Sequence, residues 1–303
     1  MVKRIATALA LTVSAGTLVA CVDDGPGHGS IVVTTNILGD VVEEVVGEEA
    51  EVVVLMDPGA DPHSFEISAR EAATVENAAL VVSNGLGLEE GVQNTVDAAD
   101  DSGVPVLPVG EHVDPIEYSE GDSAGQLDPH FWTDPMRMVT AVDQIADAVT
   151  EHVDGVDADV VTDHAADYSE QLTELDSDMA AAFDDIDEDR RNLITNHHVL
   201  GYLAQRFDFT VIGAVIPSGT TLASPSSSDL DSLASAVNDA NVPAIFADSS
   251  QPDRLAQVLA ETSDVDVDVV SLYSESLTAD GEAATYLGMM RANTESIATG
   301  LTS

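Results

Sequence analysis

Residues 157–186 read DADVVTDHAADYSEQLTELDSDMAAAFDDI and contain neither glycine nor proline. Apolar side chains recur along this stretch at steps of three or four residues, at Tyr168, Leu172, Leu175, Met179, Phe183 and Ile186. This spacing places them on one face of a helix. We therefore predict a single helix of about 30 residues, about 45 Å long at 1.5 Å per residue. A helix of that length is better suited to join two lobes than to fit inside one.

Short β-branched runs alternate with helical segments on both sides of this helix. Candidate strands lie at 31–35, 51–56, 80–84 and 104–107 before it, and at 192–195, 244–247 and 265–270 after it. Helical segments such as 37–46 and 134–153 fall between the strands. This alternation predicts an α/β fold with parallel sheets. We expect two lobes, each a mainly parallel sheet flanked by helices: an N-terminal lobe at 31–156, a linker helix at 157–187 and a C-terminal lobe at 188–303.

The first 30 residues have the pattern of a targeting segment. Met-Val-Lys-Arg is followed by an apolar stretch that ends in Leu18-Val19-Ala20-Cys21. Residues 5–20 are too few to span a bilayer, which takes about 20. The last four residues resemble the lipobox of prokaryotic lipoproteins, so we expect a signal peptide at 1–20 and a lipid on Cys21; an ordinary secretory signal is the alternative. Residues 21–30 then form a flexible tether, and the protein works outside the cytoplasm, anchored to the membrane.

The composition excludes several classes of protein. The 303 residues include 56 Asp or Glu and only 9 Lys or Arg, for a formal net charge of −47, so the chain lacks the basic surface that nucleic acid requires. A single cysteine excludes a disulfide framework and any cysteine-built zinc or iron–sulfur site. The acidic residues are scattered, and we expect a solvated face that keeps the protein soluble, as in salt-adapted proteins. A cation-collecting surface is the alternative.

Three histidine contexts are candidates for a metal site. Two are the tripeptides Asp61-Pro62-His63 and Asp128-Pro129-His130, and the third is the pair His197-His198 where a predicted strand enters a helix. Proline stiffens the turn before each of the first two histidines, and the aspartate two residues earlier can accept a hydrogen bond from the ring N–H that faces away from a metal. The spacing of 67 residues from one context to the next matches no local metal motif. The residues alone therefore leave two possibilities open, a shared metal site and unrelated turn or cap histidines.

The chain resembles the metal-specific solute-binding proteins of ABC transporters, the zinc-uptake and manganese-uptake receptors grouped with the lipoprotein adhesins. The segments that carry the resemblance follow one another along nearly all of the mature chain. They are DPHSFE at 61–66, NGLGLE at 84–89, DPHFWTDP at 128–135, HHVLGY at 197–202, PS at 225–226, FADSS at 246–250 and YSESL at 273–277, with Tyr286, Met289, Met290 and Asn293 behind them.

The resemblance implies one metal site between the lobes. Its ligands would be His63 and His130 from the N-terminal lobe and His197 and Glu275 from the C-terminal lobe. The chain departs from the family where Glu275 replaces the more usual Asp, and where His198 replaces an Asp that often follows the ligand. The second departure leaves open which histidine of the pair binds. Three acidic residues, Asp61, Asp128 and Asp248, would lie beside the ligands and hold them in place. Asp248 is also the alternative ligand.

The ligand set favours zinc. Three neutral imidazoles and one carboxylate suit Zn²⁺ in four-coordinate geometry, and raw affinity favours zinc over manganese. Manganese prefers more oxygen ligands, which Glu275 would partly supply by binding through both oxygens. Many zinc receptors of the family carry a histidine-rich loop before the second Asp-Pro-His, but residues 113–127 contain no histidine. We therefore expect Zn²⁺, with Mn²⁺ as the alternative.

The resemblance implies a receptor rather than an enzyme. We expect a monomeric surface lipoprotein that captures a divalent metal in the cleft between its lobes and delivers it to the membrane permease of an ABC transporter. The long linker helix would limit hinge motion, so that capture and release need only modest lobe or loop movement. Two alternatives stay open. In an extracellular zinc hydrolase, Glu275 would be a base and water would take the fourth metal position; a surface adhesin would bind other partners.

Overall fold

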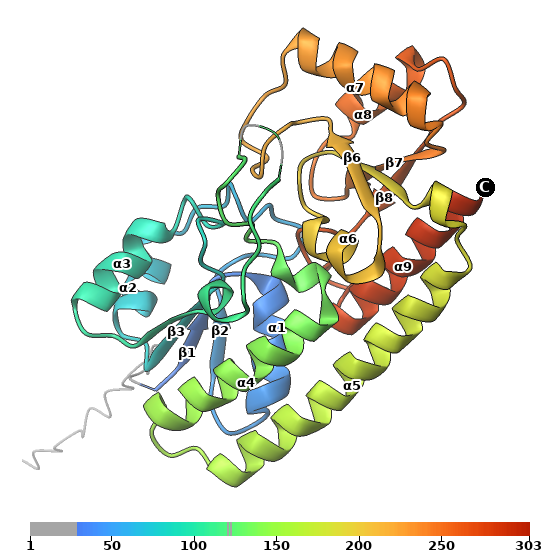
Figure 1. Cartoon of the computed structure of the whole chain (residues 1–303). Helices are drawn as coiled ribbons and strands as arrows, with labels where there is room; N and C mark the ends of the chain where they lie inside the picture. The colour runs from blue at the N-terminus through green and yellow to red at the C-terminus, as the bar shows by residue number, and fades with distance from the viewer. Residues whose placement is uncertain (1–28, 120, 122) are drawn as a thin grey trace, which may run out of the picture.

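Two four-stranded parallel sheets form the centres of two lobes in the computed structural model, which describes residues 29–119, 121 and 123–303 (Figure 1). The N-terminal sheet has the order β2-β1-β3-β4, with β1 at Ile31–Val33, β2 at Val52–Val54, β3 at Leu80–Ser83 and β4 at Val106–Pro108. The C-terminal sheet has the order β6-β5-β7-β8, with β5 at Asn192–Thr195, β6 at Thr210–Ala214, β7 at Ala244–Asp248 and β8 at Asp268–Leu272. The predicted α/β architecture of two lobes is confirmed. The expected signal peptide and Cys21 lie outside the described residues.

The predicted long helix is α5, Ala158–Asp184, with 27 residues. Asp157 caps its first turn: the Asp157 side chain accepts the backbone N–H of Asp159 and satisfies one of the free donors there. The apolar face identified in the sequence is buried along its length, at Tyr168, Leu172, Leu175, Met179 and Phe183. This face packs on α1 (Asn36–Val46) and α4 (Pro135–His152) of the N-terminal lobe and on α9 (Tyr286–Thr302) near the chain end (Figure 1).

The two lobes share one hydrophobic core. A single cluster of buried side chains runs from Val33 and Val82 of the N-terminal sheet through Leu172 of α5 to Phe246 of the C-terminal sheet. The outer faces have smaller clusters of their own, under α2 (Ala69–Glu76) and α3 (Gln93–Asp101) in one lobe and under α7 (Ser227–Ala240) and α8 (Arg254–Thr262) in the other. Exposing one buried Val, Leu or Phe of the shared core costs about 1.5–3 kcal/mol. A wide opening of the lobes that exposed this core would therefore be costly.

One strand was missed in the sequence. Three strands were predicted after the long helix, but four are present. The missed strand is β6, which lies at the edge of the C-terminal sheet. It follows closely on the seven-residue helix α6 (Gly201–Phe207), contains Gly213, and has only Ala214 fully buried. A glycine and a half-exposed face remove the alternating pattern that identifies a strand. The last strand was also placed a few residues too early, since β8 occupies 268–272 rather than 265–270.

The strands of each sheet are parallel, so their carboxyl ends lie along one edge of that sheet. In the part of the chain that the structure describes, three 3-10 turns complete the helical elements, at Val109–His112 (η1), Phe131–Thr133 (η2) and Glu188–Arg190 (η3). Among the described helices, none combines the length and the apolar character needed to cross a membrane. In open parallel sheets, ligands bind beyond the carboxyl ends of the strands. The segments that follow the strands of both sheets are therefore the places to look for a site.

Candidate metal centre

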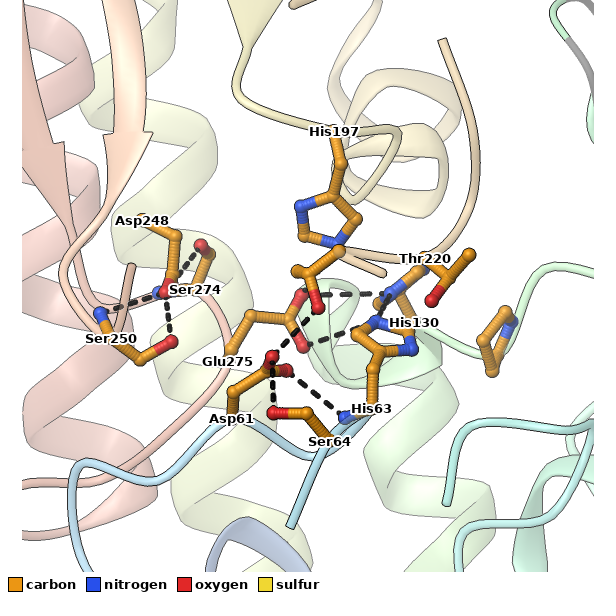
Figure 2. A network of polar contacts seen from close by, with 12 residues as sticks. Asp61, His63, Ser64, His130, His197, Thr220, Asp248, Ser250, Ser274 and Glu275 are labelled. Atoms are coloured by element: carbon orange, nitrogen blue, oxygen red, sulfur yellow. Dashed lines mark hydrogen bonds and ion pairs between the residues drawn. The ribbon is translucent and has the colours of Figure 1, made fainter. Parts of the chain in front are cut away.

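Four buried side chains from these loops meet at one point between the lobes. His63 follows β2, His130 directly precedes η2, His197 follows β5 and Glu275 follows β8. One potential ligand atom from each residue lies within 4.8 Å of all the others. Each of the four residues is at most 2% exposed. Figure 2 shows the four side chains pointing toward one another, so the structure brings together the set that the family resemblance implies.

The distances suit a small ion. The Nε2 atoms of the three imidazoles lie 3.1 Å (His197), 3.5 Å (His130) and 3.7 Å (His63) from the nearest Glu275 oxygen. The Nε2 atoms of His63 and His130 are 3.4 Å apart. Ligands on a tetrahedral zinc, at about 2.0–2.1 Å from the metal, stand about 3.3–3.4 Å from one another. These four separations lie around that value.

Several polar atoms at the centre have no hydrogen-bond partner. Both carboxylate oxygens of Glu275 and Nε2 of His197 are buried and make no hydrogen bond, although His197 Nε2 is 3.1 Å from Glu275 Oε1. Proximity without hydrogen-bond geometry leaves these atoms unsatisfied. Buried polar atoms without partners are rare in folded proteins. One cation at the centre would satisfy all of them at once.

The environment keeps the imidazoles neutral. Burial, together with the neighbouring His130 and His197, lowers the pKa of His63 to about 2. Burial also lowers the pKa of His130 and of His197 below the usual histidine range. Burial raises the pKa of the Glu275 carboxyl well above its ordinary value, and three further carboxylates add to the shift: Asp248, Asp61 and Asp128. Neutral imidazoles are the form that binds metal, while Glu275 without a cation favours its protonated form.

Asp128 orients His130. Its Oδ1 accepts the backbone N–H of His130 at 2.9 Å and lies 2.7 Å from the ring Nδ1. The hydroxyl of Tyr118 lies 3.1 Å from the same Nδ1. Burial raises the pKa of Asp128 to about 7. The hydrogen bond that the Asp-Pro-His tripeptide predicts is present here, and it directs Nε2 of His130 toward the centre of the site.

Asp61 behaves differently from Asp128. Its Oδ1 accepts the backbone N–H of His63 at 3.0 Å, but Nδ1 of the His63 ring has no hydrogen-bond partner. The other oxygen, Oδ2, accepts hydrogen bonds from Ser64, Thr221 and Gln251. The prediction of a hydrogen bond to the ring is therefore wrong for this tripeptide. The Asp61 carboxylate instead accepts from these three side chains and from the backbone N–H of His63.

Asp248 lies outside the ligand set. Its Oδ2 accepts the backbone N–H of Ser274 at 3.2 Å and the Ser274 hydroxyl at 2.6 Å, and its Oδ1 accepts the backbone N–H of Ser250 at 2.8 Å and the Ser250 hydroxyl (Figure 2). Asp248 thus joins the ends of β7 and β8 immediately before Glu275. The structure places it as a support for that segment rather than as a fourth ligand.

The geometry also separates the two adjacent histidines. His197 lies inside the group of four, whereas His198 does not belong to it. The backbone N–H of His198 donates to the carbonyl of Ser218, and its ring lies 6.2 Å from that of Tyr118 between centroids. Its side chain lines a cavity of about 370 Å³ that Asp128 also lines.

Three contacts near the site were not predicted from the sequence. The indole N–H of Trp132, two residues after His130, donates to the carbonyl of Ser274, next to Glu275, at 2.8 Å. The hydroxyl of Tyr286 donates to the carbonyl of Trp132 at 2.7 Å. The hydroxyl of Tyr118 lies 3.1 Å from Nδ1 of His130. The two contacts of Trp132 join residues 142 and 154 positions apart, so no local spacing could have predicted them.

Comparison with known proteins gives relatives over nearly the whole described chain. Residues 31–300 match the family described as "Zinc-uptake complex component A periplasmic". The manganese-binding lipoprotein MntA of Halalkalibacterium halodurans is 28% identical over 280 residues, which cover 92% of this chain and 90% of that protein. The solved structure of the periplasmic zinc-binding protein TroA from Treponema pallidum has a TM-score of 0.82 and 26% identity, and the match covers 91% of this chain and 99% of that one. A Mn-bound periplasmic metal-binding protein from Candidatus Liberibacter asiaticus gives a TM-score of 0.79 at 25% identity, covering 90% and 99%.

Proposed function

Since the chain belongs to the family of zinc-uptake complex component A periplasmic proteins, we propose that it is the extracytoplasmic metal receptor of an ABC transporter. It captures a divalent transition metal between its lobes and delivers the metal to a membrane permease. The observation that carries this proposal is the buried group of three imidazoles and one carboxylate, in which the carboxylate oxygens have no hydrogen-bond partner. The comparisons give no support to the hydrolase or adhesin alternatives.

We assign the ligands as His63, His130, His197 and Glu275. A catalytic zinc typically has three protein ligands and keeps one position for water. Four protein ligands would fill a tetrahedral site, and all four side chains are buried away from solvent. This arrangement favours a protein that holds its metal and does no chemistry on it.

We propose zinc as the preferred metal. Four separations among the ligand atoms, between 3.1 and 3.7 Å, lie around the value for tetrahedral zinc, and three nitrogen donors favour zinc over manganese. Manganese is the alternative, because MntA is named as a manganese-binding lipoprotein and one similar structure was solved with manganese bound. Two-oxygen binding by Glu275 would raise the coordination number toward what manganese prefers.

The chain architecture belongs to the same proposal. Residues 1–20 are a signal peptide, Cys21 carries lipid, and residues 21–30 tether a monomer to the outer face of the membrane. The lobes are assigned to 31–156 and 188–303, with the linker at 157–187. Replacing Cys21 by Ser and fractionating the cells tests the anchor: we expect the variant to leave the membrane fraction, and a variant that stays there would refute lipidation at this residue.

Metal content and affinity test the function directly. Protein purified without chelators is measured for bound metals by elemental analysis, and the stripped protein is titrated with Zn²⁺ and Mn²⁺ against a competing chelator. We expect one metal per chain, tighter binding of Zn²⁺, and a large loss of affinity in Glu275→Ala but not in Glu261→Ala, which changes an exposed acid on α8. Wild-type protein that bound neither ion, or an unchanged affinity in Glu275→Ala, would refute the proposal.

A further inference from the structure

Asp61 connects the loop that carries His63 to the opposite lobe. Its Oδ1 accepts the backbone N–H of His63 at 3.0 Å. Its Oδ2 accepts the hydroxyl of Thr221 at 2.7 Å and the side-chain amide of Gln251 at 2.9 Å, both from the C-terminal lobe. A third donor to Oδ2, the hydroxyl of Ser64 at 2.9 Å, comes from the same loop as Asp61 (Figure 2). The Asp61 carboxylate therefore binds both the backbone of His63 and two segments of the opposite lobe.

The two donors from the C-terminal lobe lie at its rim. Thr221 is in the connection between β6 and α7, and Gln251 follows β7; both are half-buried. They line a cavity of about 280 Å³, which Asn196, the neighbour of His197, lines as well. Thr221 and Gln251 therefore border open space on one side.

The contacts on the side of His130 are of another kind. Trp132 donates to the carbonyl of Ser274, Tyr286 donates to the carbonyl of Trp132, and all three residues are at most 3% exposed. Hydrogen bonds among buried groups are costly to break, because the separated groups find no water. His130 and Glu275 are thus held together from the interior. The partly exposed donors at the rim can exchange their bonds to Asp61 for bonds to water.

We propose that Asp61 is a positioning residue that couples His63 to closure of the rim formed by Thr221 and Gln251. With both donors bound to Asp61, the His63 loop is held at the metal; when the rim shifts and these bonds break, His63 leaves the metal before His130 does. The inference rests on the proposed metal-receptor function and adds the order of ligand release. The loop keeps one further attachment, since the backbone N–H of Gly59 lies 2.9 Å from Ser276 Oγ and from Leu277 O, so losing the rim bonds speeds release without abolishing binding.

The test measures how fast zinc leaves the protein. Full-length mature protein loaded with Zn²⁺ is mixed with an excess of chelator in a stopped-flow instrument, and the dissociation rate is compared for wild type, Thr221→Val, Gln251→Met and the double variant. Hydrogen bonds to a charged group are worth enough to change a rate about tenfold each. We expect about tenfold faster release for each single variant and up to about a hundredfold for the double variant. Thr221→Ser keeps the hydroxyl and should restore the wild-type rate.

Ser64→Ala is the matched control. It removes a donor to the same Oδ2 atom, but a donor from within the His63 loop, so release should stay near the wild-type rate. A double variant that releases zinc as slowly as wild type, or a Ser64→Ala variant that accelerates release as much as the double variant, would overturn the coupling between lobes. Thermal unfolding of the metal-free single variants identifies any that fold poorly. Wild-type protein that binds no zinc would instead overturn the proposed function itself.

Discussion

Replacing Glu275 by Gln is expected to have opposite effects on stability with and without metal. In the metal-free protein both carboxylate oxygens are buried without hydrogen bonds, and burial raises the pKa of the group well above its ordinary value. Leaving a buried polar group unsatisfied costs about 1–3 kcal/mol. Gln has nearly the same shape and carries no charge, and its amide can donate to a neutral imidazole nitrogen. The metal-free variant should therefore be more stable than wild type by about 1–3 kcal/mol, which raises the Tm by about 2–5 °C at this chain size.

The pH dependence of this difference follows from the direction of the shift. Above the ordinary pKa of Glu the unfolded chain has lost its proton, while the folded metal-free protein still holds it. The free energy of unfolding of wild type therefore falls as the pH rises from about 4.5 toward the raised pKa in the folded state. The Gln variant has no such proton, so its advantage in Tm should grow over the same pH range.

Zinc should reverse the order. A ligand at a thousand times its Kd stabilises the folded protein by about 4.1 kcal/mol, more than the advantage of the Gln variant, which gains little at the same free zinc because it lacks the anionic ligand. Calorimetric or dye-based unfolding in chelator and in buffered zinc measures both effects, with Glu261→Gln as the exposed control. A Gln variant less stable than wild type in chelator, or equally stabilised by zinc, would refute the assignment of Glu275 as the unsatisfied charged ligand.

Three further changes test the same site. His197→Ala should abolish tight zinc binding in a chelator competition while His198→Ala keeps it, since only His197 lies in the group of four; equal losses would contradict that geometry. Asp128→Asn should weaken zinc binding about 10–100-fold by leaving the ring of His130 without its carboxylate partner, and unchanged affinity would mean that this hydrogen bond is not needed. Zinc binding near pH 6 should release protons from Glu275 and none from the imidazoles, because the pKa shifts keep the imidazoles neutral. Calorimetry in buffers of different ionisation enthalpy counts the released protons. If Glu275→Gln released as many protons as wild type, Glu275 would not be their source.

The sequence predicts the architecture because its strongest signals are local. The apolar face from Tyr168 to Phe183 and the alternation of β-branched runs with helices depend on neighbours a few residues apart, and the two lobes with their long helix follow from them. Strand β6 was missed because its pattern is interrupted by Gly213 and half exposed. β2, β4 and β8 also lie at sheet edges and were predicted, so the interrupted pattern of β6, and not its edge position, explains the miss.

The site could be predicted from the sequence only in part. The tripeptides identify His63 and His130 as unusual, but the residues alone left a shared metal open, and Glu275 entered only through the family resemblance. The tripeptides are identical in sequence, yet Asp128 bonds to a ring and Asp61 bonds to the opposite lobe. What distinguishes them is the donors that the fold brings to each carboxylate. Thr221 and Gln251 are 160 and 190 residues from Asp61, beyond any pattern that spacing can show.

The shared core limits how the metal can leave. The buried cluster is continuous from the N-terminal sheet through α5 to the C-terminal sheet, so a wide hinge opening would expose side chains from both lobes at about 1.5–3 kcal/mol each. Breaking the two partly exposed hydrogen bonds at the rim costs less than exposing several such side chains, because water replaces the lost partners. The hydrogen bond between Trp132 and Ser274 is buried, so it costs more to break than a bond at the rim but less than a wide opening of the lobes. It keeps His130 near Glu275. The lowest-cost route therefore moves the loops at the carboxyl ends of the strands while the helices and sheets stay in place, which is the modest motion that the long helix predicted.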